Sequence, residues 1–234
     1  MTQNLQQNRS LVNEVFNKVY SKYDLMNDIM SFGAHRIWKN KLIKFMNPSN
    51  NQSLIDVGCG TGDIAKMYSK ATDNITNILA VDPNKNMIEK GKKKLEKYKN
   101  INWKISSAEE LDVDDETFDF YTISFGLRNT SSVKKTFKEA YRVLKKGGRF
   151  LCLEFSKIDN ENLNVIYQKY SKIIPKIGAL VVGDNKPYEY LVRSIDEFYN
   201  QQELLQFLEN EKFINCECLN LNGGIVAIHS GWKV

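Results

Sequence analysis

A glycine-rich segment at residues 56–63 is the part of this sequence best suited to hold a ligand. It reads DVGCGTGD and stands where a buried-strand pattern passes into a helical one. Glycines let a ligand approach the backbone closely, and the first turn of a helix offers N–H groups that lack partners. We therefore expect Asp56, Gly58 and Gly60 to contact a bound cofactor.

The residues around these glycines favour a ligand without phosphate. A dinucleotide-binding fingerprint needs a third glycine at position 63, where Asp63 stands, and an acidic side chain there would repel a pyrophosphate. The Gly-Lys-Ser/Thr end of a phosphate-binding loop is absent. S-adenosylmethionine carries a sulfonium and an ammonium and no phosphate, so it is the favoured ligand. Another nucleotide remains the alternative.

Two further segments have the spacing of a nucleoside site. Asp82 ends the next apolar run, about 20 residues after Gly62, where a carboxylate accepts hydrogen bonds from both ribose hydroxyls. Ser107 and Ala108 follow the third apolar run, where an adenine edge would lie. A simpler interpretation of Ser107 is a helix N-cap, which is common for serine before glutamate.

The fourth apolar run ends in the segment SFGLRN at residues 124–129. Ligands of open α/β sheets bind outside the carboxyl ends of the strands, so chemistry on an acceptor molecule is expected here. The Asn/Asp-Pro-Pro-Tyr motif of amino-group methylation is absent, and no proline precedes a cysteine as in pyrimidine C5 methylation. Nucleic-acid substrates are therefore disfavoured.

The pattern that must position these residues alternates short apolar strands with helices, which predicts a parallel, doubly wound sheet closed by a C-terminal hairpin. Strands are expected at residues 54–58, 78–82, 101–105, 118–124, 149–155, 213–219 and 225–231. Helices are expected at residues 64–70, 84–97 and 133–144, with residues 145–148 as a helix stop that carries a glycine cap.

Composition places the chain among globular proteins. The 234 residues carry 33 Lys and Arg against 28 Asp and Glu, a net charge of +5. A basic balance suits nucleic acid or an anionic membrane, but abundant lysine, asparagine and isoleucine is also the bias of an AT-rich genome. The four cysteines match neither a disulfide scaffold nor a zinc site, and we expect no metal. No signal peptide or membrane-spanning run is recognisable, which predicts a cytoplasmic protein.

Two apolar stretches lie outside this pattern. Residues 11–38 have apolar side chains at helical spacing, as in a core-covering helix or in a lid over a ligand site. Residues 163–182 are apolar with interleaved lysines. They suit a buried helix, a wall of a substrate tunnel, or peripheral contact with the inner membrane. His35, a lone histidine expected in a loop, is a weaker candidate for a polar contact.

Six motifs of the sequence together resemble the ubiquinone/menaquinone biosynthesis C-methyltransferases, the UbiE family. The resemblance runs from about residue 13 to the C-terminus, and its two most specific parts precede the glycine segment and end the fourth strand. The motifs are VFNKVYSKYDLMNDIMSFG (15–33), HRIWK (35–39), TISFGLRN (122–129), YRVLKKGGR (141–149), LEFSK (153–157) and NGGIVAIH (222–229).

The resemblance implies a Rossmann-like, seven-stranded class I methyltransferase sheet with helices on both faces and an antiparallel C-terminal strand. It implies methyl transfer from S-adenosylmethionine to a ring carbon of a polyprenylated quinol, either a 2-polyprenyl-6-methoxy-1,4-benzoquinol or demethylmenaquinol. By matching positions, the cofactor contacts would include Thr61, Asp82, Ser107, Ala108 and Ser124.

For catalysis we expect Arg128 to stabilise a forming phenolate and Asn129 to orient the ring oxygen; a surface or capping arginine is the simpler alternative. Tyr20, Tyr23 and Met26 would line the acceptor side if the N-terminal segment closes as a lid, or would pack in the core. The expected single domain divides into a lid (1–45), a cofactor-binding core (46–158), an apolar insertion (159–210) and a closing hairpin (211–234).

Competing functions are an O- or N-methyltransferase acting on another apolar small molecule, and a non-catalytic scaffold subunit of a quinone-synthesis complex. The intact glycine segment, Asp82 and the Arg128-Asn129 pair argue against the scaffold. The sequence leaves open whether the chain forms a homodimer.

Overall fold

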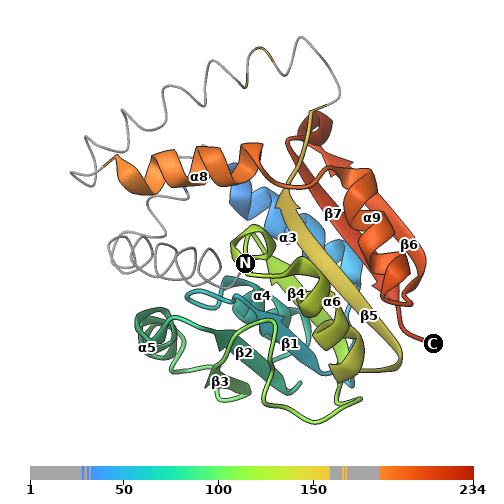
Figure 1. Cartoon of the computed structure of the whole chain (residues 1–234). Helices are drawn as coiled ribbons and strands as arrows, with labels where there is room; N and C mark the ends of the chain where they lie inside the picture. The colour runs from blue at the N-terminus through green and yellow to red at the C-terminus, as the bar shows by residue number, and fades with distance from the viewer. Residues whose placement is uncertain (1–27, 29–30, 32, 159–164, 166, 168–184) are drawn as a thin grey trace.

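A seven-stranded sheet forms the centre of the molecule in the computed structural model, which describes residues 28, 31, 33–158, 165, 167 and 185–234 (Figure 1). The strand order is β3-β2-β1-β4-β5-β7-β6. β7 pairs antiparallel with both β5 and β6, whereas the pairs among β3, β2, β1, β4 and β5 are parallel. The strands are β1 (Leu54–Val57), β2 (Ile78–Asp82), β3 (Ile101–Ile105), β4 (Phe118–Ser124), β5 (Leu144–Phe155), β6 (Ile214–Leu221) and β7 (Val226–Trp232).

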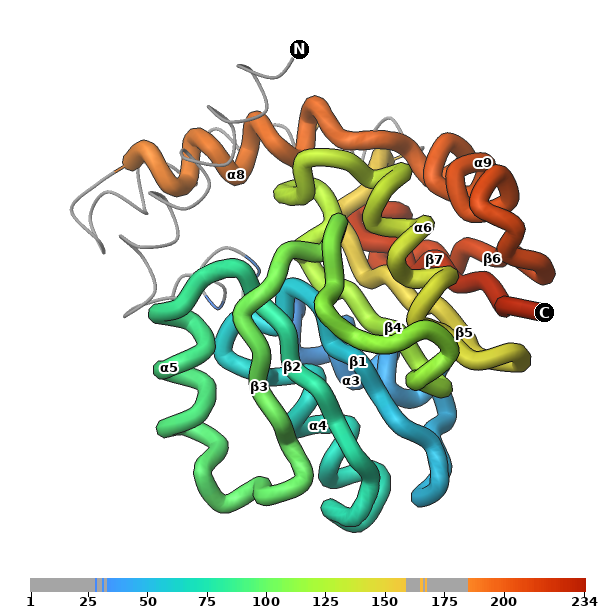
Figure 2. The backbone as a smooth tube through the Cα atoms, turned by 60° about the horizontal axis from the view of Figure 1, so that its bottom comes forward, coloured from blue at the N-terminus to red at the C-terminus, as the bar shows by residue number. Residues whose placement is uncertain are grey.

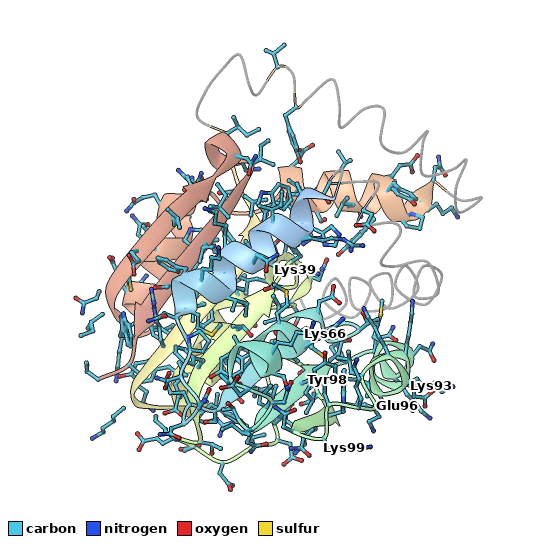
Figure 3. All side chains as sticks on the ribbon, turned by 180° about the vertical axis from the view of Figure 1, so that it is seen from behind. Lys39, Lys66, Lys93, Glu96, Tyr98 and Lys99 are labelled. Carbon is cyan, nitrogen blue, oxygen red and sulfur yellow. The ribbon has the colours of Figure 1, made fainter. Side chains whose placement is uncertain are left out.

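Helices cover both faces of this sheet. On one face lie α3 and α4, as the view from behind in Figure 3 shows, and on the other lie α6 and α9. The helices are α3 (Ala34–Met46), α4 (Asp63–Ala71), α5 (Lys85–Lys94), α6 (Val133–Val143), α8 (Lys186–Asp196) and α9 (Gln201–Asn210), with 3-10 turns η2 (Leu127–Asn129) and η3 (Asn222–Gly224). The expected class I fold, with helices on both faces and an antiparallel last strand, is confirmed.

The core is divided by the sheet into two layers. Strand β1 is buried along its whole length, because helices cover both of its faces and leave no polar side. Successive side chains of a strand enter opposite layers. Phe150 packs with Phe137 of α6 on one face, whereas Leu151 belongs to the layer around Tyr68 of α4 on the other. This two-sided burial explains the continuous apolar runs of the sequence.

The carboxyl ends of the parallel strands lie at one edge of the sheet, where the chain turns into helices (Figure 2). β1 leads into the glycine segment, β2 ends at Asp82, and β4 leads into η2. Paired registers bring these ends together, since Val57 lies beside Val81 on one side and beside Ile123 on the other. The segments that the sequence singled out therefore meet at one place.

The expected helix stop at residues 145–148 is wrong. Helix α6 ends at Val143, and β5 begins at once with Leu144. Gly147 has a φ of 77°, and its N–H donates to the carbonyl of Lys233 at 2.8 Å, while the Lys233 N–H donates to Gly148 at 2.9 Å. Gly147 and Gly148 thus belong to a strand that is already hydrogen-bonded to Lys233 near the C-terminus, and they do not cap a helix.

Several sequence expectations fall outside the described residues. Tyr20, Tyr23 and Met26 do so, as do most of the lid segment (1–45) and most of the apolar stretch 163–182. Among the described residues, no helix is long and apolar enough to span a membrane.

Gly62 gives a direct test of packing at the start of α4. Its φ is 83°, and a Cβ there would lie 2.6 Å from Cη2 of Trp103 and 2.9 Å from Cδ1 of Leu95. Gly147 has a similar φ of 77° with no atom within 4 Å of such a Cβ. Both alanine variants acquire backbone strain of about 1–2 kcal/mol, and Gly62→Ala alone adds an overlap that costs about 1–3 kcal/mol.

We therefore expect Gly62→Ala to lower the free energy of unfolding in urea by more than Gly147→Ala does. Equal losses in the two variants would show that Trp103 and Leu95 move aside without cost.

Candidate active site

The glycine segment is fixed to the neighbouring strand rather than free. Gly58 and Gly60 have φ values of 63° and 54°, a region that side chains disfavour. The N–H of Cys59 donates to the Val81 carbonyl at 3.0 Å, and the N–H of Gly60 donates to Oδ2 of Asp82 at 2.9 Å. The loop is thus held in shape by the strand that ends in the expected ribose-binding carboxylate.

Asp82 is a buried carboxylate at the end of β2. It is 8% exposed, and its Oδ1 accepts from the Asn84 N–H at 2.8 Å. Burial raises the pKa of Asp82 to about 6, although the backbone N–H groups of Asn84 and Gly60 lower it in part. A group of this kind is stabilised in its ionised form by further hydrogen-bond donors, such as a vicinal diol.

Asp56 lies deeper, at the end of β1. It is 1% exposed, and its Oδ1 accepts from the Thr122 hydroxyl at 2.9 Å. Burial raises the pKa of Asp56 to about 7, against the opposing effects of the Thr122 hydroxyl and the Ala65 backbone N–H. These bonds join β1 to β4 and to the start of α4, so Asp56 braces the base of the glycine segment.

The acid at the start of α4 is neutralised by lysines from two other helices. Oδ2 of Asp63 accepts from Lys39 of α3 at 2.8 Å, and Oδ1 accepts from Lys94 of α5 at 2.9 Å. Lys94 also donates to the Thr61 hydroxyl at 3.0 Å. Burial would raise the pKa of Asp63, but the two lysines hold it below its usual range. The network ties three helices to the glycine segment, and Figure 3 marks Lys39 at the junction of α3 and α4.

His35 is not in a loop, contrary to expectation. It lies in the first turn of α3 and is 6% exposed, with Nε2 at 2.8 Å from Oδ1 of Asp28. Burial lowers the pKa of His35, and Asp28 acts in the opposite direction. The side chain thus holds the chain entering α3.

The segment after β3 forms a turn. Ser107 makes an isolated bridge with Glu110, and Ala108 is 7% exposed. The N-cap interpretation of Ser107 is wrong, because no helix follows it. Glu109 accepts hydrogen bonds from the backbone and the hydroxyl of Ser131 and so fastens this turn to the chain before α6.

The end of β4 carries a strained residue and an unpaired hydroxyl. The Ser124 hydroxyl is buried and has no partner among the described residues. Phe125 has a φ of 56°, which is a true outlier for an aromatic residue. Its ring packs against Trp38 and Phe155 at centroid distances of 6.1 and 5.1 Å. Strain of this type gathers at functional sites, where the surrounding structure enforces it.

Arg128 forms a fully buried ion pair. Its side chain is 6% exposed, and Nη1 lies 2.7 Å from Oε1 of Glu154, a side chain at 0% exposure. Nη1 also donates to the Phe125 carbonyl at 2.6 Å, and the guanidinium lies 5.4 Å from the centroid of the Phe155 ring. Nε is buried and has no partner in the described part of the chain. The guanidinium is therefore held at one nitrogen only, in one orientation.

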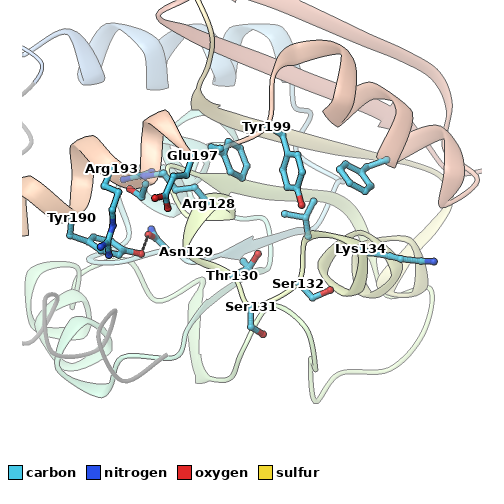
Figure 4. A pocket seen from close by; sticks show the side chains of 14 residues that line it. Arg128, Asn129, Thr130, Ser131, Ser132, Lys134, Tyr190, Arg193, Glu197 and Tyr199 are labelled. Atoms are coloured by element: carbon cyan, nitrogen blue, oxygen red, sulfur yellow. Dashed lines mark hydrogen bonds between the residues drawn. The ribbon is translucent and has the colours of Figure 1, made fainter. Parts of the chain in front are cut away.

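Asn129 lies at the wall of a cavity of about 400 Å³ between η2, the start of α6 and helix α8 (Figure 4). Its Oδ1 accepts from the Tyr190 hydroxyl at 2.9 Å, and its Nδ2 lies 3.4 Å from the Phe125 carbonyl. The cavity wall is mostly polar. It is lined by Arg128, Asn129, Thr130, Ser131, Ser132, Val133, Lys134, Tyr190, Arg193, Ser194, Glu197, Phe198, Tyr199 and Phe207.

Sequence reasoning missed the groups that hold these side chains. Glu154 left a signal, since a lone carboxylate in the apolar run LCLEF is rarely buried without a partner. Lys39 and Lys94 gave none among so many lysines. Tyr190 gave none either, because its contact joins residues 61 positions apart.

A seven-stranded sheet with an antiparallel last strand, a glycine loop bound to a buried acid on β2, and polar groups after β4 defines a class I S-adenosylmethionine-dependent methyltransferase. The comparisons agree. A family model described as "ubiE/COQ5 methyltransferase family" matches residues 2–233. A relative from Rickettsia bellii, named ubiquinone/menaquinone biosynthesis C-methyltransferase UbiE, is 47% identical over 97% of this chain and 94% of its own length. The chain belongs to the ubiE/COQ5 methyltransferase family.

Solved structures share the fold at low identity. A Thermotoga maritima methyltransferase titled a possible histamine N-methyltransferase has a TM-score of 0.67 at 19% identity, covering 95% of this chain and 100% of that one. A Haemonchus contortus phosphoethanolamine N-methyltransferase in complex with S-adenosyl-L-methionine has a TM-score of 0.63 at 14% identity, covering 83% of this chain and 52% of that one.

The buried Asp82 predicts a pH-dependent affinity for the cofactor. We expect its ionised form to accept the ribose hydroxyls, and burial raises its pKa to about 6, so affinity should fall as the pH falls through 6. Asp82→Asn removes charge-assisted hydrogen bonds worth about 1.5–3 kcal/mol, and we expect a roughly 10- to 150-fold weaker Kd at pH 8. Titration calorimetry from pH 5 to 8 measures both effects.

Asp56 titrates in both proteins, so the part of the pH dependence that disappears in Asp82→Asn belongs to Asp82. A variant that binds S-adenosylmethionine as tightly as the native protein at pH 8 would exclude Asp82 from the site.

The buried ion pair predicts a large stability loss from a small change. Glu154→Gln leaves the Arg128 charge buried without its counter-ion, which costs about 3–5 kcal/mol. Glu89 is the matched control, because it pairs with Lys85 at 3.7 Å and both side chains are more than half exposed. Glu89→Gln should cost at most about 1 kcal/mol. Urea unfolding of the two variants measures the difference, and equal losses would refute the buried pair.

Proposed function

We propose that this protein transfers a methyl group from S-adenosylmethionine to a ring carbon of a polyprenylated quinol in ubiquinone or menaquinone synthesis. Support comes from the 47% identity with relatives named for that reaction, over nearly the whole of both chains. The observation that carries the proposal is the buried, oriented guanidinium of Arg128 beside Asn129, directly after β4.

The residues proposed to hold the cofactor surround the carboxyl ends of β1, β2 and β4. Gly58 and Gly60 would give backbone access, and Asp82 would accept the ribose hydroxyls. The unpaired Ser124 hydroxyl is a buried polar group that fits a ligand partner. The remaining proposed contacts are Asp56, Thr61, Ser107 and Ala108. When bound, S-adenosylmethionine supplies an electrophilic methyl group on a sulfonium.

The reaction needs a nucleophilic carbon on the acceptor. A hydroquinone becomes nucleophilic at the carbon ortho to a hydroxyl when that hydroxyl loses its proton to water. The new C–C bond forms as the S–C bond breaks, and the ring proton at the attacked carbon then leaves to water. Negative charge builds on the ring oxygen as the phenolate forms, so a fixed positive group near that oxygen lowers the barrier.

Arg128 meets this requirement as an electrostatic group and not as a base, since an arginine side chain stays protonated in proteins. Glu154 and the Phe125 carbonyl both bind Nη1, which leaves the Nε–Nη2 edge without a partner among the described residues. A guanidinium oriented in advance needs no reorganisation when the charge develops. Asn129 is proposed to bind the same ring oxygen.

Arg128→Lys tests this assignment while it keeps the charge opposite Glu154. A lysine cannot be held at one nitrogen while it offers a second edge to the ring oxygen. We expect kcat for a reduced short-chain quinol to fall about 100-fold, with the Kd for S-adenosylmethionine changed by less than about threefold. Turnover equal to that of the native protein would exclude Arg128 from catalysis.

The quinone profile of cells tests the substrate. Deleting the gene should make the demethylated quinone accumulate, and restoring the native chain should reverse this, while the Arg128→Lys chain should not. A normal quinone profile after deletion, measured by lipid extraction and mass spectrometry, would overturn the proposed function.

A further inference from the structure

Helix α8 places one hydroxyl on the proposed catalytic amide. Tyr190 is half-buried, and its Oη donates to Oδ1 of Asn129 at 2.9 Å, as the dashed line in Figure 4 shows. Asn129 belongs to η2, which follows β4, whereas α8 begins only at Lys186. The hydrogen bond therefore joins the two sides of the cavity across 61 positions of sequence.

The direction of this hydrogen bond decides the orientation of the amide. The Asn129 amide presents an acceptor oxygen on one side and two N–H donors on the other. The Phe125 carbonyl accepts from Nδ2 at 3.4 Å and from Arg128, and a carbonyl has no hydrogen that it could donate to the oxygen of a flipped amide. The Tyr190 phenol can donate, and it donates to the amide oxygen. Burial raises the pKa of Tyr190, which keeps this phenol protonated.

With Tyr190 donating to its oxygen, the Asn129 amide is kept from flipping, and the groups that it offers on its other side are N–H donors. One N–H faces the Phe125 carbonyl, and the second has no partner among the described residues. An N–H donor binds an ionised oxygen more strongly than a neutral hydroxyl. The amide and the guanidinium of Arg128 would then both be donors toward the same oxygen.

We propose that Tyr190 is a positioning residue that fixes the Asn129 amide as a hydrogen-bond donor and so makes the site selective for the ionised hydroxyl of its acceptor. The proposal rests on the proposed function, because it concerns the acceptor oxygen of that reaction. Helix α8, which lines the cavity, would thereby also orient a side chain that acts in catalysis.

Three variants test the proposal in the full-length chain with S-adenosylmethionine and a reduced short-chain quinol. Tyr190→Phe removes the donor and lets the amide flip, so kcat should fall about tenfold with the Kd for S-adenosylmethionine within twofold. Asn129→Asp keeps the acceptor for Tyr190 but has no N–H, so kcat should fall about 100-fold, like the loss of one oxyanion donor. The kcat of Asn129→Ala should also fall about 100-fold.

The double variant separates positioning from a general structural effect. If Tyr190 acts through Asn129, then Tyr190→Phe combined with Asn129→Ala should have the same kcat as Asn129→Ala alone. Tyr188 is the matched control on the same helix, because its buried hydroxyl has no hydrogen-bond partner among the described residues. Tyr188→Phe should leave kcat unchanged.

Different results would refute the role of Tyr190 and the proposed function. A kcat equal to that of the native protein in Tyr190→Phe or in Asn129→Asp refutes the positioning role. So does a Tyr190→Phe loss of kcat that persists in the Asn129→Ala background. The proposed function stands in each of these cases. Thermal unfolding confirms that each variant is folded, and Asn129→Asp tests the donor role without changing α8. A native chain that binds S-adenosylmethionine and leaves the quinol unmethylated overturns the proposed function and the role of Tyr190 with it.

Discussion

The ion pair between Arg128 and Glu154 is the interaction on which the site depends. Both side chains are almost wholly removed from water, so each is tolerable only in the presence of the other. Glu154 lies near the end of β5, and Arg128 follows the end of β4, so the pairing of these two strands must be correct before the charges can meet. The fold thereby sets the position of a positive charge after the carboxyl end of β4.

A second set of charges fixes the glycine segment itself. Lys39 and Lys94 converge on Asp63 from α3 and α5, and Lys94 also binds Thr61. The two networks differ in their surroundings: the first excludes water, whereas Lys94 and Asp63 keep 29% of their side-chain surface exposed. A buried, rigidly held cation after β4 and a partly hydrated set of ion pairs on the glycine segment thus coexist at one edge of the sheet.

Local sequence predicted the strands well, because buried parallel strands are continuous apolar runs between turn residues. It failed at residues 145–148, where two lysines and two glycines mimic a helix end although β5 has already begun. The glycine loop, Asp82 and the segment after β4 were recognisable because each follows a strand. The partners Glu154 and Tyr190 depend on strand register and helix placement, which no local pattern records.

The left-handed backbone of Phe125 limits which residues suit this position. A glycine at that position would adopt the left-handed backbone without strain, yet it would remove the ring that packs with Trp38 and Phe155. An aromatic residue there is therefore a compromise, because the chain accepts backbone strain in return for three packed rings after the carboxyl end of β4. A substitution chosen only to remove that strain would loosen the packing at this strand end.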